Sequence, residues 1–145
     1  EIKRACREHS PSLVVAYSAA AALAMQLTGV ERVIIEPYFS TGNMMHNILR
    51  GKMWTNFPLL SYGTKGKHIR VTDKCAAEFK ELEEKAFNGE NSITHGVFFS
   101  DSTDTAGYKE YLKNFGTALS IPGKSLYGKA EQQQTAKFIK GLLEC

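Results

Sequence analysis

The sequence predicts an α/β protein in which a mostly parallel sheet carries helices on both faces, a three-layer α/β/α arrangement. Short unbroken apolar runs, typical of strands buried on both faces, alternate with segments whose apolar residues recur every three or four positions, typical of helices. The 145 residues fit one domain, so we expect residues 1–145 to form a single α/β unit. The first residue is not Met, which is compatible with a piece of a longer chain.

The chain begins with a predicted helix and strand. Residues 1–9 suit a helix that ends before Ser10 and Pro11, because a proline disfavours helical geometry in the residue ahead of it. The apolar run 13–17 predicts a strand of a parallel sheet. Neighbouring side chains of a strand point to opposite faces, so we expect Val14 and Val15 both to be buried against helices.

A second helix and strand follow. Residues 19–27 are rich in Ala, Leu, Met and Gln, which are strong helix formers, and Gly29 stands where a helix commonly ends. The run 33–35 predicts the next buried strand, which Glu36 and Pro37 close.

The second half of the chain repeats this alternation. Residues 73–87 predict a helix that Asp73 caps, with apolar residues at spacings of three and four. The remaining predicted elements are a strand over 96–100, a helix over 108–115, a strand over 118–121 and an amphipathic helix over 131–143.

Between the two halves, residues 38–70 interrupt the pattern with several glycines and a set of large apolar side chains. Residues 43–49 are compatible with a helix, whereas the rest predicts a long irregular excursion from the sheet. Long loops in compact domains are often functional. Two interpretations stay open, a lid over a pocket and a surface connection anchored by its apolar residues.

Composition excludes several classes of function. The formal net charge of +3 arises from 18 basic and 15 acidic residues spread along the chain, without the basic stripe and interleaved aromatics of a nucleic-acid-binding protein. The longest apolar stretch, 13–27, is shorter than the roughly 20 residues that cross a bilayer. We therefore expect neither a nucleic-acid partner nor a membrane span; the sequence leaves the oligomeric state open.

Cysteine spacing and phosphate-binding motifs add further exclusions. Cys6, Cys75 and Cys145 lie too far apart in sequence for a zinc or redox motif, which predicts free thiols in a reducing compartment and a cytoplasmic protein. No glycine-rich phosphate loop follows a predicted strand. The sequence thus predicts no cofactor and no metal.

Ser18 stands at the junction between the strand 13–17 and the helix that follows. One interpretation is a helix N-cap, for which serine is favoured. The other is a nucleophile on a sharp strand-to-helix turn, which requires small residues two positions before and after the serine; Ala16 and Ala20 meet that requirement. Backbone N–H groups at the start of the helix could then stabilise an oxyanion.

Two segments of the chain resemble the α/β-hydrolase family. SLVVAYSAAAALAMQLTGVERVIIEPYFST is similar to the family's stretch from the strand before the nucleophile, through the nucleophile elbow and its helix, to the next strand. GVFFSDSTDTAGYKEYLKNFGTALSIPG resembles the two C-terminal strands of that fold. The family's elbow usually reads Gly-x-Ser-x-Gly, whereas this chain has alanine at both flanking positions.

The resemblance implies Ser18 as the nucleophile and an acidic residue after the strand 96–100 that orients the base. That acid is Asp104 or Asp101, and the spacing favours Asp104; either could instead cap a turn or the next helix. The family's histidine follows the last strand, but residues 122–128 contain none. His46 and His68, both in the excursion, are the histidines that could fold over Ser18.

The sequence therefore predicts a serine hydrolase of the esterase, thioesterase or amidase type that acts on a small ester or acyl substrate. A hydroxyl is a poor nucleophile without a neighbouring base. The missing histidine therefore supports a second hypothesis, a catalytically silent α/β-hydrolase-like domain that serves binding or assembly.

Overall fold

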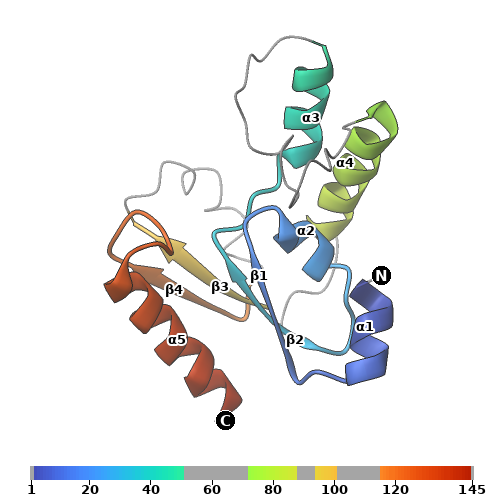
Figure 1. The fold of residues 1–145 in the computed structure, drawn as a ribbon. Coiled ribbons are helices and arrows are strands. Elements are labelled where there is room, and N and C mark those ends of the chain that lie inside the picture. Colours follow the sequence, from blue (N-terminus) through green and yellow to red (C-terminus); the bar gives the residue numbers. More distant parts are fainter. Residues whose placement is uncertain (1, 51–71, 88–93, 101–114, 145) are drawn as a thin grey trace, which may run out of the picture.

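The computed structural model describes residues 2–50, 72–87, 94–100 and 115–144. Its centre is a four-stranded sheet in which every neighbouring pair of strands is parallel. The strands follow one another across the sheet in chain order (Figure 1), namely β1 (Leu13–Tyr17), β2 (Glu31–Ile35), β3 (Thr94–Phe99) and β4 (Thr117–Ile121). The predicted α/β class with a parallel sheet is confirmed.

Five helices accompany the sheet in the described ranges: α1 (Ile2–His9), α2 (Ala20–Ala24), α3 (Thr41–Leu49), α4 (Asp73–Phe87) and α5 (Lys129–Leu143). The predicted bounds of β1 and α4 are confirmed, and the other predicted elements that fall on described residues differ at their ends. The excursion from residue 51 to 70 and almost all of the helix predicted over 108–115 lie outside the described residues, so the lid interpretation stays a prediction.

Apolar side chains gather on both faces of the sheet because neighbouring residues of a strand point to opposite sides. On one face, Val33, Val97 and Ile121 form a cluster against which Phe138 and Ile139 of α5 pack. On the other face, Ile34 and Ala16 meet the small side chains of α2, Ala21 and Ala24. Figure 1 shows α5 lying along β4, while α3 and α4 stand side by side beyond α2.

The expectation that Val14 and Val15 are both buried is wrong for Val15, which is 48% exposed. Val14 is partly buried and packs against the α2 cluster. β1 is the edge strand of the described sheet, and Val15 points to the face that α5 covers. Because α5 packs mainly against β4, the outer strand on that face keeps part of its apolar surface accessible.

The helix predicted over 19–27 is shorter in the structure, where α2 ends at Ala24. The buried side chain of Arg32 reaches the following turn and donates hydrogen bonds to the carbonyl oxygens of Leu27 at 2.5 Å and Met25 at 3.4 Å. Its Nε donates to Thr94 Oγ1 at 3.0 Å. Burial lowers the pKa of the Arg32 guanidinium, although arginine keeps its charge in proteins. The Arg32 guanidinium thus satisfies two carbonyl oxygens in the turn that follows α2.

A second buried charge joins α3 to α4. Glu83 of α4 accepts hydrogen bonds from the backbone N–H groups of Thr41 at 2.6 Å and Gly42 at 3.3 Å, so it satisfies two of the unpaired donors at the start of α3. Gly42 also permits the close approach of the two helices, since a Cβ there would lie 2.6 Å from the backbone nitrogen of Lys80. These contacts hold the first part of the excursion against the body of the fold.

The cap of α4 differs from the prediction. Asp73 was expected to cap this helix, but Thr72 Oγ1 accepts the N–H of Cys75 at 3.2 Å, and Asp73 is the first helical residue. Asp73 still lies where the helix dipole favours a negative charge.

None of the helices in the described ranges is both long and apolar enough to span a membrane.

Val33 and Val15 provide a matched test of this packing. They are register partners on neighbouring strands and point to the same face, but Val33 is 0% exposed and Val15 is 48% exposed. We expect Val33→Ala to lower the free energy of unfolding by about 2 kcal/mol and Val15→Ala by less than about 1 kcal/mol. Urea denaturation measures both. Equal losses would contradict the placement of β1 at an incompletely covered edge.

Candidate active site

Ser18 follows the last residue of β1 and has a φ of +54°. A positive φ is uncommon for a residue other than glycine, because the Cβ crowds the backbone in the left-handed region. A serine with a positive φ between a parallel strand and a helix is compatible with the strained strand-to-helix turn of a nucleophile elbow.

Three backbone hydrogen bonds hold the turn. Ser18 N–H donates to the carbonyl oxygen of Ile35 at 3.0 Å, which extends the β1–β2 ladder by one position. The Ser18 carbonyl accepts the N–H of Ala21 at 3.0 Å and that of Tyr38 at 3.2 Å. Both backbone groups of Ser18 are therefore satisfied, and the segment leaving β2 is fastened to the same residue.

The alternative role for Ser18, a side-chain cap of α2, is not what the structure shows. The N-cap residue of α2 is Ala19, and no side-chain hydrogen bond caps the helix. Within the described ranges, the Ser18 hydroxyl has no hydrogen-bond partner, and neither has the backbone N–H of Ala19. A hydroxyl and an adjacent N–H donor are thus both available at the end of β1.

Of the two small residues that flank Ser18, Ala16 lies in a close contact as expected, whereas Ala20 does not. Ala16 is 7% exposed and packs against Ala21 and Ala24, so a small side chain there does allow β1 and α2 to approach closely. Ala20 is exposed, and its size is not constrained by the described contacts. The dipole of α2 can stabilise an oxyanion only weakly, because the helix is only five residues long.

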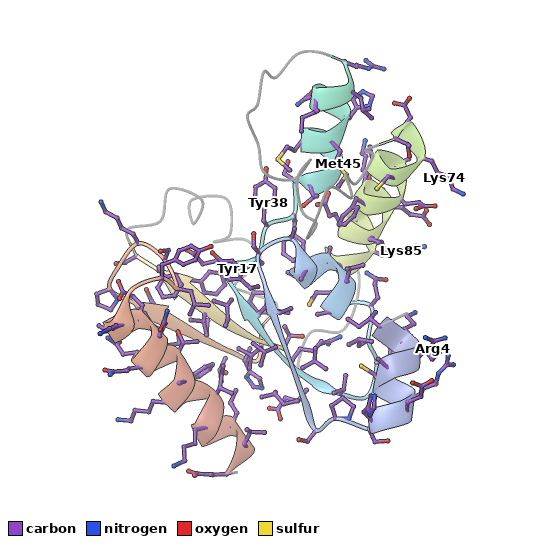
Figure 2. The ribbon with its side chains drawn as sticks, in the orientation of Figure 1. Arg4, Tyr17, Tyr38, Met45, Lys74 and Lys85 are labelled. Atoms are coloured by element: carbon purple, nitrogen blue, oxygen red, sulfur yellow. The ribbon has the colours of Figure 1, made fainter. Side chains whose placement is uncertain are left out.

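An apolar cavity of about 470 Å³ lies at the end of β1, and Ser18 itself is not one of its lining residues. Tyr17, which precedes Ser18, and Ile35, which accepts its N–H, both line it. The opposite wall consists of Leu126, Tyr127 and four residues of α5, namely Gln132, Thr135, Ala136 and Ile139. Figure 2 shows Tyr17 at the end of β1, near the start of α5.

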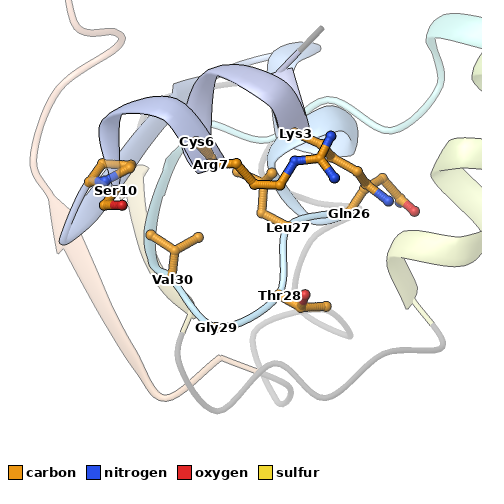
Figure 3. Close-up of a pocket in the computed structure, with 10 residues that line it drawn as sticks. Lys3, Cys6, Arg7, Ser10, Gln26, Leu27, Thr28, Gly29 and Val30 are labelled. Atoms are coloured by element: carbon orange, nitrogen blue, oxygen red, sulfur yellow. The ribbon is translucent and has the colours of Figure 1, made fainter.

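Two other cavities lie apart from Ser18. The first, of about 450 Å³, lies between α1 and the turn after α2; Figure 3 shows Arg7 and Gln26 reaching toward the same end of it, with Cys6 and Lys3 on the α1 side. The second, of about 300 Å³, lies between α3 and α4. Neither is lined by Ser18, and the second is lined by His46, one of the two histidines that the sequence offered as a base.

None of the histidines in the described ranges lies beside Ser18. His9 is the last residue of α1 and precedes β1, and His46 lines the cavity between α3 and α4. His95 lies near the start of β3, whereas Ser18 follows the end of a parallel strand. His68 and both predicted acids, Asp104 and Asp101, lie outside the described residues.

His95 takes part in a polar network that the sequence did not predict. Its Nε2 lies 2.6 Å from Glu31 Oε1 and its Nδ1 lies 2.5 Å from Thr117 Oγ1, so it links the starts of β2 and β4. His95 is 8% exposed, and its ring meets Phe138 edge to face. This hydrogen-bonded series of an acid, an imidazole and a hydroxyl resembles a catalytic relay. However, no cavity described above is lined by any of the three residues. We interpret this network as structural.

No group of three potential metal ligands is present among the described residues. Cys6 and Cys75 are free thiols, as expected, and Cys145 is outside the described ranges.

The chain matches no protein-family model, no curated protein and no solved structure.

The conformation of Ser18 predicts an unusual ranking of substitutions. Glycine adopts a positive φ without the Cβ penalty, so we expect Ser18→Gly to be more stable than Ser18→Ala by about 1 kcal/mol. At a negative φ the order would reverse, because glycine loses more backbone entropy than alanine on folding. Thermal and urea unfolding of the two variants distinguishes these outcomes.

Proposed function

We propose that this chain is a serine hydrolase of the α/β-hydrolase type, with a three-layer α/β/α architecture and Ser18 as its nucleophile. The observation that carries the proposal is the left-handed backbone of Ser18 at the end of a parallel strand. Such strain at a non-glycine residue occurs often at functional sites. The substrate class is an ester, thioester or amide.

The chemistry would follow from the groups at this turn. Ser18 Oγ attacks the acyl carbon while a base accepts the hydroxyl proton, and the proton then passes to the leaving group as its bond to the acyl carbon breaks. The N–H of Ala19 is placed next to the nucleophile, where it could donate to the developing oxyanion. Water then releases the acyl group from Ser18 by the reverse proton transfers.

The described residues do not supply the base that this mechanism requires. His9, His46 and His95 lie elsewhere in the fold, so His68 is the remaining histidine of the chain. We propose His68 as the base and Asp104 as the residue that orients it, with Asp101 as the alternative acid.

The absence of a histidine beside Ser18 within the described ranges favours a second candidate function. A silent α/β-hydrolase-like domain would keep the turn for packing alone and would serve binding or assembly. Exposed apolar side chains on β1, Val15 and Tyr17, are compatible with that role.

A fluorophosphonate probe separates the two candidates, because it phosphonylates only an activated serine. We expect labelling of the wild-type protein, loss of labelling by a factor of about 10³ or more in Ser18→Ala, and a strong reduction in His68→Ala. Ser120→Ala, on the exposed surface of β4, is the matched control and should be labelled like the wild type.

Melting curves recorded in parallel confirm that each variant is folded. Folded wild-type protein that takes up no probe would overturn the hydrolase proposal, and so would labelling that survives Ser18→Ala.

A further inference from the structure

We infer that the apolar cavity lined by Tyr17 and Ile35 binds an uncharged, largely hydrocarbon acyl group that carries a hydrogen-bonding atom. The inference that the bound group is the acyl portion of a substrate rests on the proposed function, whereas binding itself does not. Its volume of about 470 Å³ falls within the roughly 300–1,000 Å³ of small-molecule sites, which are mostly apolar with a few placed polar groups.

The lining of the cavity determines the chemistry of its ligand. Ile35, Leu126, Ala136 and Ile139 contribute apolar surface and Gln132 contributes an uncharged amide; among the described residues, no Lys, Arg, Asp, Glu or His side chain lines the cavity. A charged ligand would therefore lose its hydration without gaining an ion pair. An aliphatic or aromatic group instead gains free energy by removing this surface from water.

Thr135 adds a second, independent observation. It lines the cavity and is 3% exposed, yet its Oγ1 is buried without a hydrogen-bond partner among the described residues. A buried hydroxyl that lacks a partner is costly, and such groups in folded proteins generally have one. A ligand oxygen at this depth of the cavity would complete the hydrogen bonding of Thr135.

The position of the cavity connects it to the proposed chemistry. Its wall includes the residue before Ser18 and the residue whose carbonyl accepts the Ser18 N–H. A ligand that fills the cavity and extends past Tyr17 therefore reaches the strand end where Ser18 lies. This arrangement fits an acyl chain lodged between β2 and α5 with its carbonyl at Ser18.

Binding can be measured without catalysis. The uncharged fluorophore N-phenyl-1-naphthylamine should bind the wild-type protein saturably, and 1-octanol should displace it. Ala136→Phe places a ring in the cavity and should weaken fluorophore binding at least about tenfold. Ala130→Phe makes the same change at an exposed residue of the same helix that does not line the cavity, and should leave binding unchanged.

An isosteric substitution tests whether the Thr135 hydroxyl binds the ligand. Thr135→Val keeps the shape of the side chain and removes the hydrogen-bonding group, so we expect the displacement constant of 1-octanol to weaken roughly fivefold. Saturable binding that Ala136→Phe does not weaken in a folded protein would overturn the inference, and so would unaltered 1-octanol binding by Thr135→Val.

Catalytic preference tests the acyl assignment. Wild-type protein should hydrolyse 4-nitrophenyl octanoate with a higher kcat/KM than the acetate, and Ala136→Phe should remove that preference while Ala130→Phe keeps it. Hydrolysis at Ser18 with no dependence on chain length would overturn the acyl assignment and leave the hydrolase proposal intact. Fluorophore binding that depends on Ala136, in a protein that hydrolyses neither ester, would overturn the hydrolase proposal and leave the cavity as a binding site.

Discussion

The described fold depends on one backbone constraint, the left-handed turn at Ser18. Its N–H bonds to Ile35 and its carbonyl accepts two N–H groups, those of Ala21 and Tyr38. The same residue thereby ends β1, starts the turn into α2 and fastens the chain as it leaves β2. A left-handed L-residue is unfavourable by about 1–2 kcal/mol, so the surrounding hydrogen bonds and the packing of Ala16 against α2 must offset that cost.

The order of the strands explains why an apolar cavity opens beside this turn. In a sheet whose strands follow one another in chain order, right-handed crossovers place successive connecting helices on one face. The face opposite α2 is covered, among the described elements, by α5, which lies along β4. Coverage therefore diminishes toward β1, where Val15 and Tyr17 remain partly exposed. The cavity and the exposed edge are two results of the same arrangement.

Local sequence patterns predicted much of the fold. The apolar run 13–17 and the periodic segment 73–87 match β1 and α4 at both ends, because a short buried strand and an amphipathic helix are each specified by neighbouring residues. The turn at Ser18 could also be predicted from the sequence, because a small residue before Ser18 and a helix-forming segment after it both occur within a few positions.

Most errors of prediction involve residues distant in sequence, whereas the cap of α4, where Thr72 takes the place of Asp73, is a local difference. Val15 is exposed because β1 lies at an edge, and the strand order is decided by pairing across the whole chain. α2 ends at Ala24, and in the turn that follows it Arg32 donates to the carbonyl oxygens of Met25 and Leu27 while its Nε donates to Thr94 Oγ1. The capping of α3 by Glu83 and the network around His95 likewise join segments far apart in sequence, for which a single sequence contains no periodic signal.

The turn at Ser18 is open to direct measurement by NMR in solution. A positive φ brings the amide and α protons of one residue closer together than any negative φ of a helix or strand does. The account predicts a strong intraresidue amide-to-α-proton NOE at Ser18, together with slow hydrogen exchange of its amide, which Ile35 holds. A weak intraresidue NOE with rapid exchange would show an ordinary helix start at Ser18 and would contradict the nucleophile-elbow account.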